Sequence, residues 1–188
     1  MKIVAINGSP RKEGNTAALL KAVVAEHKDV DLIYFDLVDM KIKDCIACMH
    51  CKTHDSCSIK DDMSKIYAAL KECDAVVLAS PIYMGAETGI MKSAVDSMYA
   101  LLAFSEGPGR YKPKLPPGKK AVVLFTCGAP NGDTSMGYQK DRYYATLAGQ
   151  GYAQVKAFII GGVSPATSIM EKVEVPKIVE ECRKFLHH

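Results

Sequence analysis

The sequence predicts an α/β fold with a doubly wound, five-stranded parallel sheet. Five short runs rich in β-branched residues alternate with segments of helical apolar spacing, and this alternation is typical of a parallel sheet covered by helices on both faces. For five strands we expect the flavodoxin-like order 2-1-3-4-5. The length of 188 residues is near the roughly 150 residues of one domain. We therefore expect a single flavodoxin-like domain over residues 1–188, with a cysteine-rich insertion at 41–60 after the second strand.

Each strand is expected where an apolar run ends at a turn residue. The first run, residues 2–7, is continuous and stops before Gly8, as a buried strand does. The third run stops at Pro81, which has no N–H to donate to the ladder. The five strands are expected at 2–7, 31–37, 74–80, 120–126 and 154–160.

The helices are expected where apolar residues recur every three or four positions. Asp61 or Asp62 can cap the second of them. Residues 105–119 and 127–137 are rich in Gly and Pro and predict surface loops. The five helices are expected at 16–27, from 61 or 62 to about 73, and at 89–104, 138–150 and 172–187.

Charge and hydropathy exclude several classes of protein. Lys and Arg number 24 and Asp and Glu number 21, so the net charge of +3 is too small to indicate a nucleic-acid surface. The sequence has no run of about 18 apolar residues, the length expected of a membrane span. The first residues become polar too early, at Asn7, for a secretory signal. We expect a cytoplasmic protein that binds neither nucleic acid nor membrane.

The loop after the first strand predicts a phosphate site. Residues Gly8 to Thr16 match neither the dinucleotide fingerprint G-x-G-x-x-G nor a P-loop. Ser9 and Thr16 carry hydroxyls, Asn15 carries an amide and Arg11 carries a charge. Together with the amino terminus of the following helix, these groups suit one phosphomonoester. An ordinary capped helix after a tight turn is the alternative.

The loop after the third strand, Pro81-Ile82-Tyr83-Met84-Gly85, predicts a platform for a flat ring. Tyr83 and Met84 offer apolar, polarizable surface to an aromatic heterocycle. Gly85 lets backbone N–H groups approach the ring closely. The alternative is a strand-to-helix turn whose side chains only cover the edge of the sheet.

The loop after the fourth strand begins with Cys127 and Gly128 and could close over such a ring. We expect Cys127 to be a small buried residue rather than a nucleophile, because no histidine is evident nearby. Loops that follow parallel strands meet at one edge of the sheet. A phosphate grip, a ring platform and a cover at that edge suit flavin mononucleotide (FMN).

These motifs also resemble a known family. Gly8-Ser9-Pro10-Arg11 with Gly14-Asn15-Thr16, and Ser80-Pro81-Ile82-Tyr83-Met84-Gly85 with Lys92 and Asp96, resemble the NADPH-dependent FMN reductases of flavodoxin-like fold. The resemblance runs from residue 1 to about residue 100. It implies an FMN-dependent oxidoreductase with NAD(P)H as a candidate co-substrate.

Four of the seven cysteines lie close together, at Cys45, Cys48, Cys51 and Cys57. An odd number of cysteines without a signal peptide argues against a disulfide framework. Three thiols at intervals of three residues, with a fourth close behind, can wrap a four-iron cubane, for which thiolate is the usual ligand. Zinc sites usually pair two such knuckles across a longer segment. Zinc and free or redox-active thiols are the alternatives.

The segment from Cys45 to Cys57, followed by Asp61-Asp62-Met63, resembles the iron–sulfur flavoproteins of anaerobic microbes. That resemblance implies one FMN and one [4Fe–4S] cluster per chain, and a homodimer or higher homo-oligomer in which the cluster meets the flavin of a neighbouring subunit. It implies Cys45, Cys48, Cys51 and Cys57 as cluster ligands. It implies flavin contacts from Ser9, Arg11, Asn15, Thr16, Tyr83, Met84 and Gly85.

The sequence thus predicts an FMN-dependent, electron-transferring oxidoreductase in which the cofactors supply the chemistry and no side chain need act as acid or base. A cluster-free NAD(P)H-dependent FMN or quinone reductase and a thiol-based redox sensor are the alternatives. NAD(P)H and ferredoxin are both candidate electron donors. A group of lysines predicts either a solvated loop or a docking patch for an acidic partner such as ferredoxin: Lys112, Lys114, Lys119 and Lys120.

Overall fold

A parallel sheet forms the centre of the fold in the computed structural model, which describes residues 1–27, 30–106 and 110–187. Its strand order is β2-β1-β3-β7-β8, which confirms the predicted order 2-1-3-4-5. The strands are β1 (Lys2–Asn7), β2 (Asp31–Asp36), β3 (Ala75–Tyr83), β7 (Lys120–Thr126) and β8 (Gln154–Ile160). A short strand, β4 (Ala86–Glu87), pairs antiparallel with β3.

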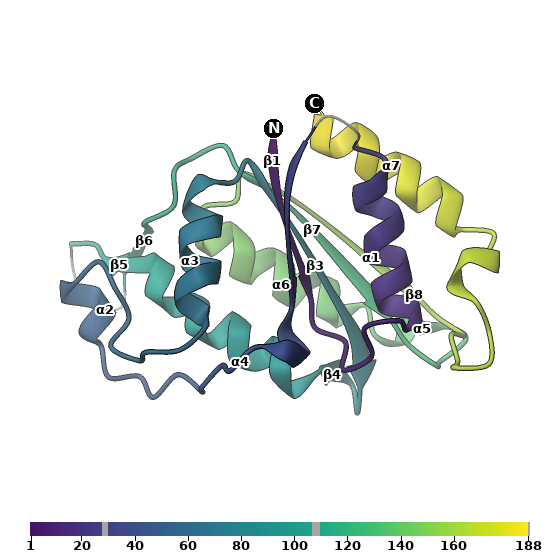
Figure 1. Cartoon of the computed structure of the whole chain (residues 1–188), viewed down its shortest axis with the longest axis horizontal. Coiled ribbons are helices and arrows are strands. Elements are labelled where there is room, and N and C mark those ends of the chain that lie inside the picture. Colours follow the sequence, from purple (N-terminus) through teal and green to yellow (C-terminus); the bar gives the residue numbers. More distant parts are fainter. Residues whose placement is uncertain (28–29, 107–109, 188) are drawn as a thin grey trace.

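Helices cover both faces of this sheet (Figure 1). The longer ones are α1 (Asn15–Ala25), α3 (Met63–Glu72), α4 (Gly89–Ser97), α6 (Tyr138–Gly149) and α7 (Val175–His187). The shorter ones are α2 (His50–Thr53), α5 (Gly132–Ser135) and the 3-10 helices η1 (Leu37–Asp39), η2 (Met98–Leu101) and η3 (Ile169–Glu171). Among the described residues, no helix has both the length and the apolar character that crossing a bilayer requires.

Alternate strand residues face opposite helix layers. In β1, Val4 and Ile6 pack with residues of α3, α4 and α6, whereas Ile3 and Ala5 pack with residues of α1 and α7. All four side chains are fully buried. Burial on both faces explains why the strands read as continuous apolar runs rather than as alternating ones.

The loop after β1 is fixed tightly against β3 and α4. The Gly8 N–H donates to the Ala79 carbonyl (2.7 Å), and the Thr88 hydroxyl donates to the Gly8 carbonyl (2.6 Å). A Cβ atom at Gly8 would lie 2.8 Å from Met91 Cβ and 3.2 Å from the Ala79 carbonyl oxygen, so a larger residue would force these atoms to shift. The loop that predicts a phosphate site therefore starts from a rigid position at the carboxyl edge of the sheet.

The expectation that Pro81 ends the third strand is wrong, because β3 continues to Tyr83. The Ala79 carbonyl bonds toward β1, and backbone groups two residues apart point to the same side of a strand. The missing N–H of Pro81 therefore faces the side where β1 has already ended at Asn7. No ladder bond is lost there, so proline is tolerated.

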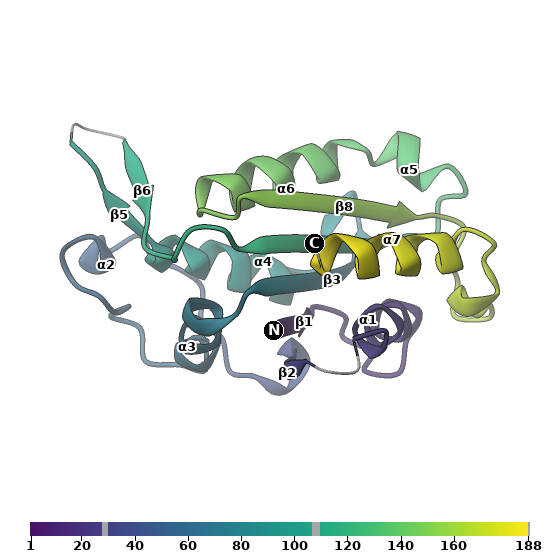
Figure 2. The ribbon, with the colours of Figure 1, turned by 90° about the horizontal axis from the view of Figure 1, so that it is seen from above.

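The predicted helix over 89–104 and the predicted loop over 105–119 are also wrong in part. Helix α4 ends at Ser97, and β5 (Leu102–Phe104) pairs antiparallel with β6 (Tyr111–Pro113). Residues 107–109 lie outside the described part of the chain. The hairpin stands away from the body of the fold, beside α2 (Figure 2).

The lysines near this hairpin are not a solvated loop. The ammonium groups of Lys114, Lys119 and Lys120 all donate to backbone carbonyls. Lys119, only 5% exposed, donates to the carbonyls of Lys71 (3.0 Å) and Cys73. Three of the four lysines of the predicted patch are thus bonded within the protein, whereas Lys112 is exposed on β6.

Lys119→Met is expected to destabilise the protein by about 1–3 kcal/mol, because it leaves two carbonyls at the ends of α3 and β3 without their charged donor. Urea unfolding measures the effect. Lys112→Met is the matched control, since Lys112 is exposed on β6, and we expect no measurable change from it. Equal stability of the two variants would contradict the structural role of Lys119.

Candidate functional site

A pocket of about 80 Å³ opens at the carboxyl edge of the sheet, between the amino terminus of α1 and the loops after β3, β7 and β8. Eight residues singled out in the sequence line it: Ser9, Arg11, Asn15, Thr16, Pro81, Tyr83, Cys127 and Gly128. They come from three segments at this edge: the loop after β1 with the first turn of α1, the end of β3, and the loop after β7. The topology of the sheet therefore brings the three predicted motifs together.

The amino terminus of α1 forms one end of this pocket. Gly14 precedes the helix in an extended conformation, and no side chain caps it. The first helical bond runs from the Ala18 N–H to the Gly14 carbonyl, so the N–H groups of residues 15–17 are left for a ligand. The exposed Arg11 adds a positive charge at the rim. Backbone donors, a helix dipole and a guanidinium make an anion site.

The Ser9 side chain shapes the loop that carries Arg11. Its hydroxyl accepts a hydrogen bond from the Arg11 N–H and lies equally close to the Arg11 carbonyl, both at 3.1 Å. The Ser9 N–H donates to the Asn7 side chain (3.0 Å). Ser9 is therefore a buried turn residue as well as a lining residue of the pocket.

A buried pair of threonines joins two of the loops. The hydroxyls of Thr16, on α1, and Thr126, at the end of β7, lie 2.7 Å apart. This contact brings Cys127 beside the helix terminus. Burial raises the pKa of the Cys127 thiol, which favours the neutral form and agrees with the expectation that this residue is not a nucleophile.

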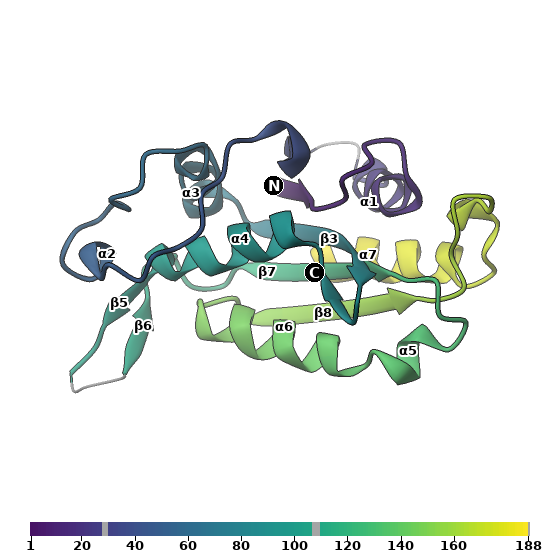
Figure 3. The same cartoon turned by 90° about the horizontal axis from the view of Figure 1, so that it is seen from below.

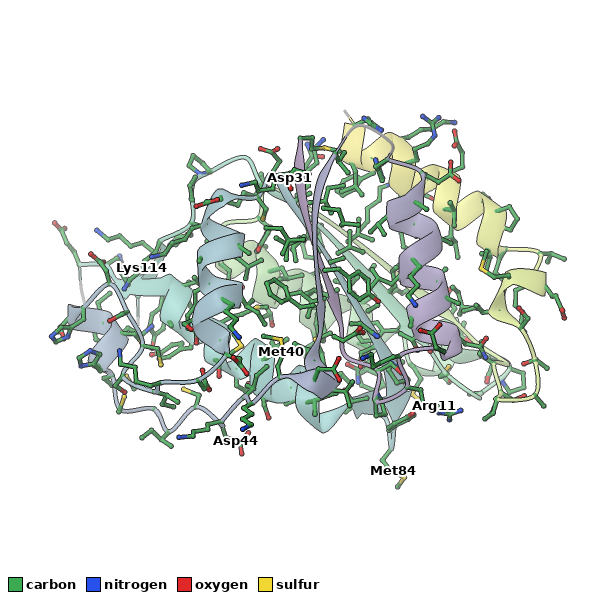
Figure 4. All side chains as sticks on the ribbon, in the orientation of Figure 1. Arg11, Asp31, Met40, Asp44, Met84 and Lys114 are labelled. Atoms are coloured by element: carbon green, nitrogen blue, oxygen red, sulfur yellow. The ribbon has the colours of Figure 1, made fainter. Side chains whose placement is uncertain are left out.

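The turn between β3 and β4 projects from the same edge. Met84 and Gly85 both have left-handed backbone angles, with φ of 49° and 82°, as in the two-residue type I′ hairpin turn. A methionine in this conformation is uncommon. Its side chain is fully exposed and points away from the fold, at the edge where Arg11 also lies (Figure 4).

Helix α6 holds this turn in place. The Gly85 carbonyl accepts hydrogen bonds from the Tyr138 hydroxyl and the Gln139 amide. Just after the turn, the Glu87 side chain is fully buried and pairs with the Arg142 guanidinium of α6. Contacts with α6 therefore hold the exposed turn in position.

Three of the predicted ring contacts do not line the pocket. Ile82 packs in the core, and Met84 and Gly85 form the projecting turn. Conversely, the pocket includes residues that the sequence did not single out as ligands: Gly14, Thr126, Val163, Ser164 and Pro165. The last three follow the glycines that end β8, and the rule that loops gather at the carboxyl edge could have identified them.

The four clustered cysteines line a second, narrow pocket of about 20 Å³: Cys45, Cys48, Cys51 and Cys57. Cys51 is buried on α2, whereas Cys45 and Cys48 are exposed. Between them, Ala47 and Met49 have left-handed backbone angles, with φ of 50° and 59°. Such left-handed residues turn backbone N–H groups into concavities of the kind that surround phosphates and iron–sulfur clusters.

In the described residues, no three His, Cys, Asp or Glu side chains form a group that could hold one metal ion. A tetrahedral zinc ion, with Zn–S bonds of about 2.3 Å, needs its sulfurs within about 4 Å of one another. In a cubane, each thiolate binds a different iron atom, so the sulfurs stand farther apart. The metal content of this loop therefore remains a prediction.

Two aspartates close the base of the cysteine loop. The Asp62 carboxylate accepts a hydrogen bond from the Lys41 N–H (2.8 Å), and the Asp61 carboxylate accepts one from the Lys43 N–H (2.9 Å). Asp62 occupies the N-cap position of α3 but makes no side-chain cap bond, whereas Asp61, one residue earlier, accepts a hydrogen bond from the Met63 N–H (3.0 Å). The loop is therefore closed at its base by side-chain-to-backbone bonds.

Two lysines link the cysteine loop to the segment that carries the hairpin: one donates from the loop, and the other donates to the loop. Lys52, on α2, donates to the carbonyls of Tyr99 (2.6 Å) and Leu102 (2.8 Å). Lys114, after β6, donates to the carbonyls of Cys51 (2.6 Å) and His54 (2.8 Å). Burial lowers the pKa of Lys52. Both ammonium groups place positive charge beside the thiols.

The environment of Cys48, in the cluster, differs from that of two isolated thiols, Cys73 and Cys182. The Ser58 hydroxyl lies 3.1 Å from Cys48 Sγ and lowers the pKa of that exposed thiol. Burial instead raises the pKa of Cys73 to about 11 and that of Cys182 to about 12. Cys73 and Cys182 are therefore buried core thiols, whereas Cys48 is an exposed thiol whose pKa lies below its usual value.

Comparison with known sequences agrees with this arrangement. The profile of the NADPH-dependent FMN reductase family matches residues 1–150. An iron–sulfur flavoprotein of Methanocaldococcus jannaschii is 36% identical over 51% of this chain and 51% of its own length, and one of Archaeoglobus fulgidus is 42% identical over 51% of this chain and 48% of its own. The chain thus spans about half the length of these curated relatives. An iron–sulfur flavoprotein of Clostridioides difficile is 28% identical over 100% of this chain and 79% of its own length.

Comparison with solved structures shows the same fold. An NAD(P)H:quinone oxidoreductase from Methanothermobacter marburgensis superposes with a TM-score of 0.74 at 15% identity, over 100% of this chain and 98% of its own. An FMN-dependent NADH-azoreductase from Bacillus anthracis, in complex with FMN, superposes with a TM-score of 0.71 at 15% identity, over 99% and 97%.

Met84→Asn is expected to stabilise the protein by about 0.5–1 kcal/mol, because Asn-Gly is the preferred pair for a type I′ turn and asparagine tolerates the left-handed conformation. Chemical denaturation of the cofactor-free protein measures it. Met84→Ala is the control, since it truncates the same exposed side chain but keeps the unfavourable backbone angle. If the two variants unfold at the same urea concentration, the turn stores no strain.

Proposed function

Because the chain belongs to the NADPH-dependent FMN reductase family, we propose that it is an FMN-dependent oxidoreductase of the iron–sulfur flavoprotein type. One observation carries the proposal: motifs after β1, β3 and β7, each selected for a different chemical reason, line one pocket at the amino terminus of α1. The names of its relatives, iron–sulfur flavoproteins, support the same conclusion. NAD(P)H is the proposed electron donor, in keeping with the family's name.

The residues of the pocket fit FMN. The N–H groups of residues 15–17 and the Arg11 guanidinium would bind the phosphate, because both complement a dianion. Tyr83, half-exposed beside Pro81, would cover the ring and exclude water from one side of it. Gly128 leaves room for the backbone to approach from the opposite loop. We assign no side chain as a general acid or base.

The cysteine loop fits a cluster. Four thiols around one pocket, left-handed turns between them and two nearby ammonium groups complement an anionic cluster. Cys45, Cys48, Cys51 and Cys57 are the proposed ligands. When bound, FMN exchanges electron pairs with a substrate and single electrons with a carrier such as a [4Fe–4S] cluster.

A second function, a cluster-free NAD(P)H-dependent FMN or quinone reductase, is favoured by the absence of a three-ligand metal group in the part of the chain that is described. It keeps the flavin site and leaves the cysteines as thiols. A redox-sensing module is the third candidate, supported by the exposed Cys48 thiol beside Ser58. Ferredoxin has no support as a partner, since three of the four lysines proposed to dock it donate to backbone carbonyls of this chain.

A homodimer or higher homo-oligomer is part of the proposal. Large apolar side chains are exposed on the cysteine loop and the neighbouring hairpin: Ile46, Met49, Phe104 and Tyr111. Clustered exposed apolar residues are typical of contact surfaces between proteins. Light scattering of the purified protein measures the subunit number directly.

Anaerobically purified protein is expected to contain one FMN, four iron atoms and four acid-labile sulfides per chain. Cys48→Ser is expected to lower the iron and sulfide content and to leave the FMN content unchanged, because the two sites use different residues. Cys182→Ser is the control, since Cys182 is buried under α7, far from the loop. Flavin without iron in the wild type would favour the cluster-free reductase, and protein with neither would contradict both.

Arg11→Ala is expected to weaken FMN binding by about 10- to 100-fold, the loss of one charge-assisted hydrogen bond to phosphate. Riboflavin, which lacks the phosphate, is expected to bind both proteins equally. Fluorescence titration measures both affinities. Lys12→Ala is the matched control, because Lys12 is the adjacent cation but pairs with Asp39 (2.6 Å). A similar loss for Lys12→Ala would show that only the net charge matters.

A further inference from the structure

The Asn15 side chain bonds to a loop about 150 residues away in the sequence. Its amide donates to the carbonyls of Ser164 (2.8 Å) and Thr167 (2.9 Å), and its Oδ1 accepts from the Ile169 N–H (2.9 Å). Both N–H groups and the oxygen of the carboxamide are therefore engaged. Little hydrogen-bonding capacity is left for a phosphate, although the Asn15 backbone N–H still lies in the first turn of α1.

The bonded loop forms one wall of the pocket. Val163, Ser164 and Pro165 line it together with Arg11. At its start, the loop is tied to the sheet by the Val163 N–H, which donates to the Cys127 carbonyl (2.9 Å). Beyond Val163, the bonds of Asn15 attach the loop to α1.

The loop also has an internal shape that suits a rigid wall. The Thr167 hydroxyl accepts a hydrogen bond from the Ser164 N–H (3.0 Å), and the Ser164 hydroxyl accepts one from the Ala166 N–H (3.2 Å). Such local bonds hold the turn itself. They do not bond the turn to α1; the bonds of Asn15 do so, together with the packing of the buried Ile169 in the core cluster that contains α1.

We propose that Asn15 is a positioning residue: its carboxamide holds the segment Val163–Thr167 as the outer wall of the phosphate pocket, and it promotes binding of a phosphate monoester through that wall rather than by touching the ester. The inference rests on the proposed FMN site. The wall excludes water from the helix terminus, and the lower local dielectric strengthens the remaining hydrogen bonds and charges there. The wall also lies outside residues 1–150, which the family profile matches.

Asn15→Ala tests the proposal by amide hydrogen exchange and flavin titration. In the cofactor-free protein, the Ile169 amide is expected to exchange at least tenfold faster in Asn15→Ala than in the wild type, because its acceptor is gone. FMN affinity is expected to fall about tenfold, and saturating FMN should slow the exchange again. Asn15→Asp keeps an acceptor for Ile169 and is expected to show intermediate exchange.

Arg11→Ala is the matched control for direct contact. It is expected to weaken FMN binding while leaving exchange at Ile169 at the wild-type rate. Asn15→Ala with weakened FMN binding but unchanged exchange would make Asn15 a direct ligand and overturn the proposal. Faster exchange with unchanged FMN affinity would also overturn it, since the wall would then be irrelevant to binding. A wild-type protein that binds no FMN would instead overturn the proposed function, so the two failures are distinguishable.

Discussion

The uncapped amino terminus of α1 is the constraint on which the candidate flavin site depends. A helix must leave its first N–H groups without internal partners, and here no side chain takes them up. Gly8 and Thr88 fix the preceding loop against β3 and α4, so these donors stand at one defined point of the sheet edge. A ligand with a dianionic end satisfies them better than water, because the helix dipole and a guanidinium act on the same charge. The other residues of the pocket lie around the amino terminus of α1.

The cysteine loop is held by a different kind of interaction. It contains only one short helix, α2, and therefore has few backbone bonds of its own. Its position comes from charged donors on backbone carbonyls, with Lys52 and Lys114 acting in opposite directions between the loop and the hairpin. Hydrogen bonds to charged groups are about twice as strong as neutral ones. The same two charges that fasten the loop also make its interior favourable for thiolates.

The sequence predicted the features that depend on local patterns. The five strands and their order follow from continuous β-branched runs, and the loop motifs follow from the strands that precede them. The hairpin β5–β6 was missed because its strands have three residues each and depend on Lys52 and Lys114 rather than on their own pattern. The loop after β8 and the bonds of Asn15 were missed because partners about 150 residues apart leave no local signal. The roles of the site residues remain predictions.

One helical segment connects the two candidate sites. At its start, the Thr88 backbone N–H donates to the Ser80 hydroxyl (3.1 Å), and the Thr88 hydroxyl donates to the Gly8 carbonyl, so Thr88 links β3 to the loop after β1 beside the candidate flavin pocket. At its end, the Tyr99 carbonyl on η2 binds Lys52 of the cysteine loop. Figure 3 shows α4 running from β4 toward the hairpin, and a groove of about 670 Å³ beside it is lined by Glu87 at one end and Cys45 at the other. Because both ends of this segment are bonded to a site, the distance between the two sites within a chain is set by the length of one short helix rather than by a flexible loop.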